Sequence, residues 1–202
     1  MLKIIPQGFL DGACLLYAVQ NAFKALINPE LRLTAYYVKY RMESKWQQFV
    51  GLVPSPHNFL DGSGSGVGLK TNRQESEVIL SMLRNSCPIF SSKAHEFQVR
   101  RISIQEFREK KDYRSSVVIF PTTGRASTDC HEYLVHWFVA VGRDSGHLLL
   151  ACSSAVYAGR EYDERMDPLT GHVFNDRIKT GRINKTCMGA EYIYQVEVAP
   201  KP

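Results

Sequence analysis

The spacing of apolar residues changes along this chain, and that change constrains the fold more than any other feature. Before residue 90, apolar residues recur every three or four positions, which is typical of helices. After residue 97 they alternate with polar residues, which is typical of strands. Helices that come first and antiparallel-type strands that come last predict an α+β domain. The 202 residues suit one domain, with a helical part over 1–112 and a sheet part over 113–202.

Three helices are predicted in the first part. The clearest covers residues 13–27, which have a turn signal on each side. A second helix is expected over residues 34–50, and a third over residues 73–85 with Asn72 as its cap. The segment 51–72 is dense in Gly, Pro and Ser, so we expect a loop there.

The second part is predicted to consist of strands and one short helix. Ser103 can cap a helix over residues 103–110, and Glu106 three positions later completes a capping box. Residues 143–146 form a turn between two strands of a hairpin. Residues 153–190 are polar and are predicted to be irregular. The strands are expected at residues 97–102, 116–120 (closed by Pro121), 133–142, 147–152 and 191–198.

Charge and composition exclude several classes of protein. The chain has 25 Lys and Arg against 20 Asp and Glu, a net charge of +5, and contains no run of five like charges. A nucleic-acid surface would show a denser basic patch with interleaved aromatic residues. We therefore interpret these charges as a solvated face and expect no nucleic-acid partner.

The remaining composition points to a protein without cofactor or membrane span. No apolar stretch approaches the roughly 20 residues that a membrane span requires. The first residues lack a leader pattern, so we expect the protein to be cytoplasmic at synthesis, with delivery to a target cell left open. The five cysteines include no C-x-x-C pair, which argues against a disulfide framework and a structural zinc site. The oligomeric state is left undetermined.

A cysteine stands where the first helix is expected to begin. Cys14 falls in the first turn, where free backbone N–H groups and the helix dipole favour a thiolate. The small residues Gly12 and Ala13 leave room for a substrate carbonyl. The side-chain amide of Gln7 can return to the same place as an oxyanion donor. A lone helical cysteine is more often a small buried core residue, so this pattern needs a second one beside it.

The second pattern is a histidine near the start of an apolar strand. Residues 134–142 read Leu-Val-His-Trp-Phe-Val-Ala-Val-Gly and place His136 at the rim of the sheet. From there an imidazole can face a thiolate across a cleft, as its partner and later as the acid for the leaving group. A histidine that satisfies a single hydrogen bond at a strand start is the alternative.

Together the two patterns resemble the papain-like cysteine peptidase superfamily, and within it the C39-like bacterial branch. The similarity lies in Gln7 with residues 11–14 (Asp-Gly-Ala-Cys), followed by residues 136–142 (His-Trp-Phe-Val-Ala-Val-Gly). It implies a papain-like fold, with N-terminal helices packed on a C-terminal antiparallel sheet. It also implies that Cys14 is the nucleophile, that His136 is the base and acid, and that Gln7 and the Cys14 N–H form the oxyanion hole.

The sequence departs from that family at the third catalytic position. Family members carry Asp or Asn on the strand after the histidine, to orient its ring. At that distance from His136 this chain has Cys152, Ser153 and Ser154. The ring is then oriented by a serine hydroxyl, for which we favour Ser153, or by another residue such as Asp144. A Cys–His dyad, or a site that has lost its activity, would equally account for the missing Asp or Asn.

These observations support three interpretations of function. The first is a thiol hydrolase, most simply a peptidase acting on a protein or peptide amide through an acyl-enzyme. The second uses the same residues to transfer the acyl group to an amine. The third is a papain-like binding or regulatory module without turnover, which the missing Asp or Asn supports.

Overall fold

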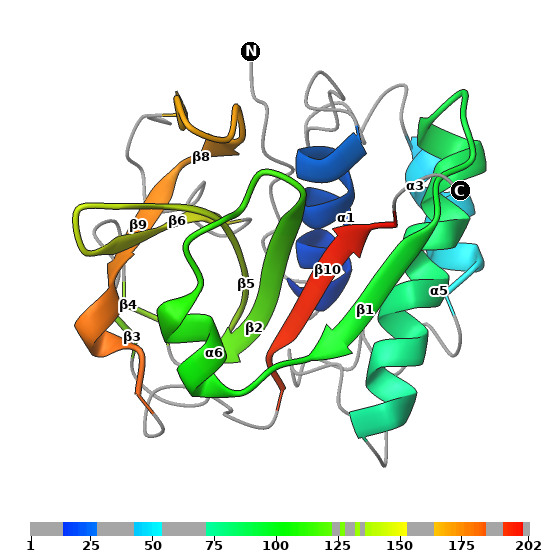
Figure 1. The fold of residues 1–202 in the computed structure, drawn as a ribbon. Helices are drawn as coiled ribbons and strands as arrows, with labels where there is room; N and C mark the ends of the chain where they lie inside the picture. The colour runs from blue at the N-terminus through cyan, green and yellow to red at the C-terminus, as the bar shows by residue number, and fades with distance from the viewer. Residues whose placement is uncertain are drawn as a thin grey trace.

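The computed structural model is a mixed α+β protein, as predicted, with helices against an antiparallel sheet (Figure 1). It describes residues 14–27, 43–53, 72–122, 126–127, 132–133, 136–152, 164–184 and 192–199. Within those ranges, no helix has the length and hydropathy that a membrane span requires.

A six-stranded sheet forms the centre of the molecule, and every pairing in it is antiparallel. The last strand along the chain lies between the first two, so the C-terminal segment joins both parts (Figure 1). In spatial order the strands are β1 (Phe97–Arg101), β10 (Tyr194–Val198), β2 (Ser116–Thr122), β5 (His136–Asp144), β6 (His147–Ala151) and β9 (Asp176–Lys179). Two short pairs accompany it, β3 (Ala126–Ser127) with β4 (Glu132–Tyr133) and β7 (Arg165–Met166) with β8 (Val173–Phe174).

The long helices pack on one face of this sheet. Helix α1 (Cys14–Ile27) contacts β2, β5 and β10, and α5 (Asn72–Phe90) contacts β1. Helix α3 (Glu43–Gly51) packs on α5. The prediction of a helix over 13–27 is confirmed, and the part of the predicted second helix before Glu43 lies outside the described residues.

The predicted end of the third helix was wrong. Helix α5 begins at Asn72, the residue predicted as its cap, and runs five residues beyond Asn85, through Pro88. Pro88 removes one helical hydrogen bond, but the packing beyond it outweighs that loss. Phe90 is buried, and its ring lies 6.4 Å from the ring of Phe23, centroid to centroid.

The opposite face of the sheet has its own apolar core. Helix α6 (Ile104–Glu109) and the short 3₁₀ helix η3 (Thr180–Arg182) lie on this side, and α6 buries Phe107 in the core. The predicted capping box is confirmed, since the Ser103 hydroxyl accepts from the Glu106 N–H and the Glu106 carboxylate accepts from the Ser103 N–H. The sheet is therefore buried on both faces, which explains the continuous apolar runs of β2 and β5.

Two strand predictions need correction. Strand β2 does not end before Pro121 but continues through it to Thr122. Its neighbour β10 ends opposite Ile119, so the proline nitrogen meets no strand on that side. The segment 153–190 was predicted to be irregular, but it contains β7, β8 and also β9, which pairs with β6.

The predicted hairpin between β5 and β6 is confirmed, and it contains a β-bulge. The turn is Ser145-Gly146, both with positive φ (22° and 95°), and it pairs Asp144 with His147. The register shifts by one residue between Ala140 and Gly142, which makes Val141 the extra residue of β5.

The loop between β7 and β8 holds this bulge. The Nδ1–H of His172 donates to the Val141 carbonyl at 2.8 Å. The Asp167 carboxylate lies against Gly142, where an added Cβ would stand 2.5 Å from its Oδ2 atom. Asp167 is itself fixed by the Thr170 hydroxyl and the Leu169 N–H, so it cannot move aside freely.

We expect Gly142→Ala to lower the free energy of unfolding by about 1–3 kcal/mol, the usual cost of overpacking a well-packed site. Denaturant unfolding followed by circular dichroism measures this. Gly51→Ala is the matched control, since an added Cβ there meets nothing within 4 Å and alanine favours a helix. Equal stability of the two variants would show that Asp167 does not constrain the bulge.

Candidate active site

Cys14 is the first residue of α1 and is buried. The backbone N–H groups of a first helical turn have no partner inside the helix. No acidic side chain lies in the first turn of α1, so nothing within that turn opposes a negative charge on the sulfur. The side chain belongs to the apolar core between α1 and the sheet.

His136 is the first residue of β5 and is also buried. Its backbone is held by Thr122 at the end of β2: the His136 N–H donates to the Thr122 hydroxyl oxygen at 3.2 Å, and that hydroxyl donates to the His136 carbonyl at 3.4 Å. Its ring meets the ring of Phe138 edge-on, at 4.7 Å between centroids. The imidazole therefore lies on the side of the sheet that carries the second core.

Burial lowers the pKa of His136 to about 3, because the charged ring would lose its hydration. The imidazole is accordingly neutral at physiological pH. A neutral imidazole has one nitrogen that donates and one that accepts a proton, so it can serve as a general base.

Cys152 is the neighbour of this ring. Its sulfur lies 3.6 Å from His136 Nε2, and its side chain is fully buried. The bulge at Val141 explains the contact. The turn register alone would put residue 153 on the face of His136, but the one-residue shift pairs Ala151 with Val139 and brings Cys152 to that face instead. Complete burial makes Cys152 a poor nucleophile for an external substrate.

Asn175 fixes the backbone of Cys152. The Cys152 N–H donates to Asn175 Oδ1 at 2.8 Å, and Asn175 Nδ2 donates to the Cys152 carbonyl at 2.9 Å. The Asn175 N–H donates to the Leu150 carbonyl at 3.0 Å, so the residue continues the pairing of β9 with β6. The sequence analysis missed this role, since nothing in the pattern of residues 153–190 distinguishes Asn175.

The residues predicted for the site fall into three groups. Cys14 and His136 begin two elements, α1 and β5, that pack directly on each other. Gln7 and Ser153 lie outside the described residues, so their roles stay predictions, as does that of Ser154. Asp144 lies at the far end of β5, about 26 Å along the strand from His136, so the prediction that it could orient the ring was wrong.

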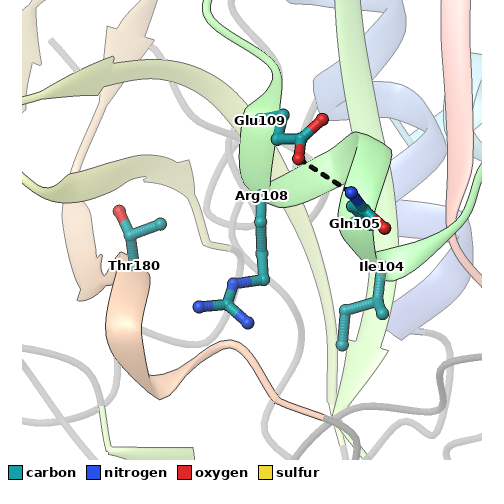
Figure 2. Close-up of a pocket in the computed structure, with 5 residues that line it drawn as sticks. All are labelled: Ile104, Gln105, Arg108, Glu109 and Thr180. Carbon is teal, nitrogen blue, oxygen red and sulfur yellow. Dashed lines mark hydrogen bonds between the residues drawn. The ribbon is translucent and has the colours of Figure 1, made fainter.

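A separate open pocket of about 470 Å³ lies between α6 and η3 (Figure 2). The Arg108 side chain extends toward Thr180 across it, while Gln105 donates to Glu109 at 3.0 Å along its helix side. None of the predicted site residues lies on these two elements. In the part of the chain that the structure describes, no three His, Cys, Asp or Glu side chains gather as a metal site would require.

No family model matches this chain, and no curated protein or solved structure is significantly similar to it.

The neutral state of His136 predicts a pH-dependent stability. Its pKa is depressed in the folded protein below the unfolded value of about 6.5, so the unfolded chain binds the proton more tightly. The stabilisation is complete above about pH 6.5 and is lost as the pH falls toward 3. Between pH 6.5 and 5 the loss amounts to about 2 kcal/mol of unfolding free energy.

Denaturant unfolding at pH 7 and pH 5 measures this loss, and His136→Asn should remove it. His147→Asn, beside the β5–β6 turn, is the control and should keep the pH dependence of the wild type. Parallel losses in the wild type and His136→Asn would mean that His136 carries its charge in the folded protein.

Proposed function

We propose that this protein is a papain-like thiol hydrolase that cleaves a protein or peptide amide through an acyl-enzyme on Cys14. The observation that carries the proposal is the direct packing of α1 on β5, because these elements begin with Cys14 and His136. The antiparallel sheet with helices on one face agrees with the fold that the family resemblance implies.

In the proposed reaction, neutral His136 accepts the thiol proton of Cys14 as the sulfur attacks the carbonyl carbon of the substrate. The Cys14 N–H and the Gln7 amide stabilise the oxyanion. The C–N bond then breaks, and His136 gives its proton to the departing amine. Water, activated by the same imidazole, hydrolyses the thioester and restores the thiol.

The reaction requires the His136 ring to reach Cys14 around the end of the sheet. Cys14 belongs to the core on the helix side, and the ring leaves β5 on the other side. A residue at the end of a strand can meet a helix terminus past that end, whereas a mid-strand residue would be separated from it by the sheet. The position of His136 as the first residue of β5 supports the proposal for this reason.

A papain-like binding module without turnover is the second candidate. Two observations favour it: a thiol, and not a carboxylate or amide, stands beside Nε2, and burial opposes a charge on the ring. Acyl transfer to an amine would use the same residues as hydrolysis and differs only in the group that attacks the thioester.

Alkylation of the folded chain with iodoacetamide tests the proposal. Cys14 should react faster than the buried thiols Cys87 and Cys152, and His136→Asn should abolish the difference, because the base is lost. Peptide mass spectrometry over time gives each rate. Cys87→Ala is the control and should leave the rate at Cys14 unchanged. Equal, slow labelling of all three thiols would favour the inert module.

Gln7→Ala should lower turnover about 10²- to 10³-fold, the usual cost of removing one oxyanion donor. The variant should keep the unfolding free energy of the wild type and the alkylation rate at Cys14, since neither depends on the oxyanion. Turnover is measured on the substrate identified by comparing peptides released by the wild type and by Cys14→Ala. Unchanged turnover would remove Gln7 from the site.

A further inference from the structure

The side chain of Asn175 acts on Cys152 in place of a neighbouring strand. Beyond Leu150, the pairing of β6 with β9 stops, and the Asn175 amide makes both backbone hydrogen bonds of Cys152. Asn175 is buried, so water does not compete for these bonds. The end of β6, and with it the Cys152 sulfur, is therefore held in one position.

The His136 side chain is restrained from two directions. Thr122 holds its backbone against β2, and the Phe138 ring supports one edge of the imidazole. The Cys152 sulfur lies at Nε2, 3.6 Å away. Only Cys152 among these three neighbours faces a ring nitrogen with a group that can accept a hydrogen bond.

We propose that Cys152 and Asn175 are positioning residues for His136: the Nε2–H donates to the Cys152 sulfur, and Asn175 fixes the backbone that carries that sulfur. The proton on Nε2 leaves Nδ1 as the basic nitrogen. The opposite arrangement, with the thiol donating to Nε2, would put the ring proton on Nδ1 and leave no basic nitrogen for Cys14. The catalytic consequence rests on the proposed function, whereas the tautomer does not.

The ring nitrogens of His136 test this inference directly. In the full chain labelled with ¹⁵N-histidine, two-bond ¹⁵N–¹H NMR spectra at pH 7 should show the Nε2–H tautomer. Cys152→Ala should convert this signal into that of a tautomer mixture. Cys152→Asn, close in size to the wild type and supplying a carbonyl acceptor, should restore it. Ser153→Ala should leave the signal unchanged.

Asn175→Ala should also give the tautomer mixture, through displacement of the Cys152 backbone. Asn85→Ala is its matched control, because Asn85 likewise bonds a backbone carbonyl, that of Leu52, but lies on α5. Where Asn175→Ala fails to fold, the two Cys152 variants carry the test. An Nδ1–H tautomer in the wild type, or an unchanged signal in Cys152→Ala, would overturn the inference. A change in Ser153→Ala alone would assign the role to Ser153.

Alkylation separates this inference from the proposed function. If both hold, Cys152→Ala and Asn175→Ala lower the rate at Cys14 about tenfold, a part of the roughly 10²- to 10⁴-fold that a positioned base contributes. A tautomer that responds to Cys152 without preferential labelling of Cys14 would support the positioning role and refute the hydrolase. Preferential labelling that Cys152→Ala leaves unchanged would do the reverse.

Discussion

The hydrogen bond from His172 to the Val141 carbonyl sets the register on which the candidate site depends. A bulge residue leaves the strand ladder, so its carbonyl needs another donor when it is buried. His172 supplies that donor, and the close approach of Asp167 to Gly142 seats the same loop beside it. A loop remote in sequence from both Cys14 and His136 thus decides which residue of β6 lies beside the imidazole.

The two faces of the sheet divide the work of the fold. The helix-side core buries α1 from Cys14 to Lys24, so the helix that carries the thiol has little freedom to move. The opposite core, closed by Phe107 of α6, contains the ring of Phe138 and the sulfur of Cys152. The candidate nucleophile and the candidate base are therefore each fixed by a different core, and the end of β5 is where the two are proposed to meet.

The parts of the fold that depend on local pattern could be predicted from the sequence. Helix α1, the capping box of α6 and the β5–β6 hairpin depend on periodicity, one hydrogen-bonded motif and one turn. The extension of α5 past Pro88 and the strand β9 depend on tertiary packing, which local propensity does not contain. The neighbour of the imidazole shows the same limit at a single residue. Counting back from the turn predicts that residue 153 shares a face with His136, which agrees with the choice of Ser153 made from spacing. The bulge at Val141 moves the register by one, and Cys152 takes that position. A histidine 31 residues further along the chain stabilises that bulge, and no local pattern indicates it.

The electrostatics of His136 determine what kind of thiol chemistry the site can support. Lowering its pKa from about 6.5 to about 3 opposes the imidazolium by on the order of 5 kcal/mol. A sulfur acceptor at Nε2 offsets less of this than a carboxylate would, because a charged acceptor makes the stronger bond to a cation. A resting thiolate–imidazolium pair is therefore disfavoured, and Cys14 would stay a thiol until a substrate carbonyl arrives. Proton transfer would then accompany the attack, which makes the rate sensitive to how accurately a substrate is placed. Such a site suits a selective hydrolase acting on a well-fitted peptide better than a general protease.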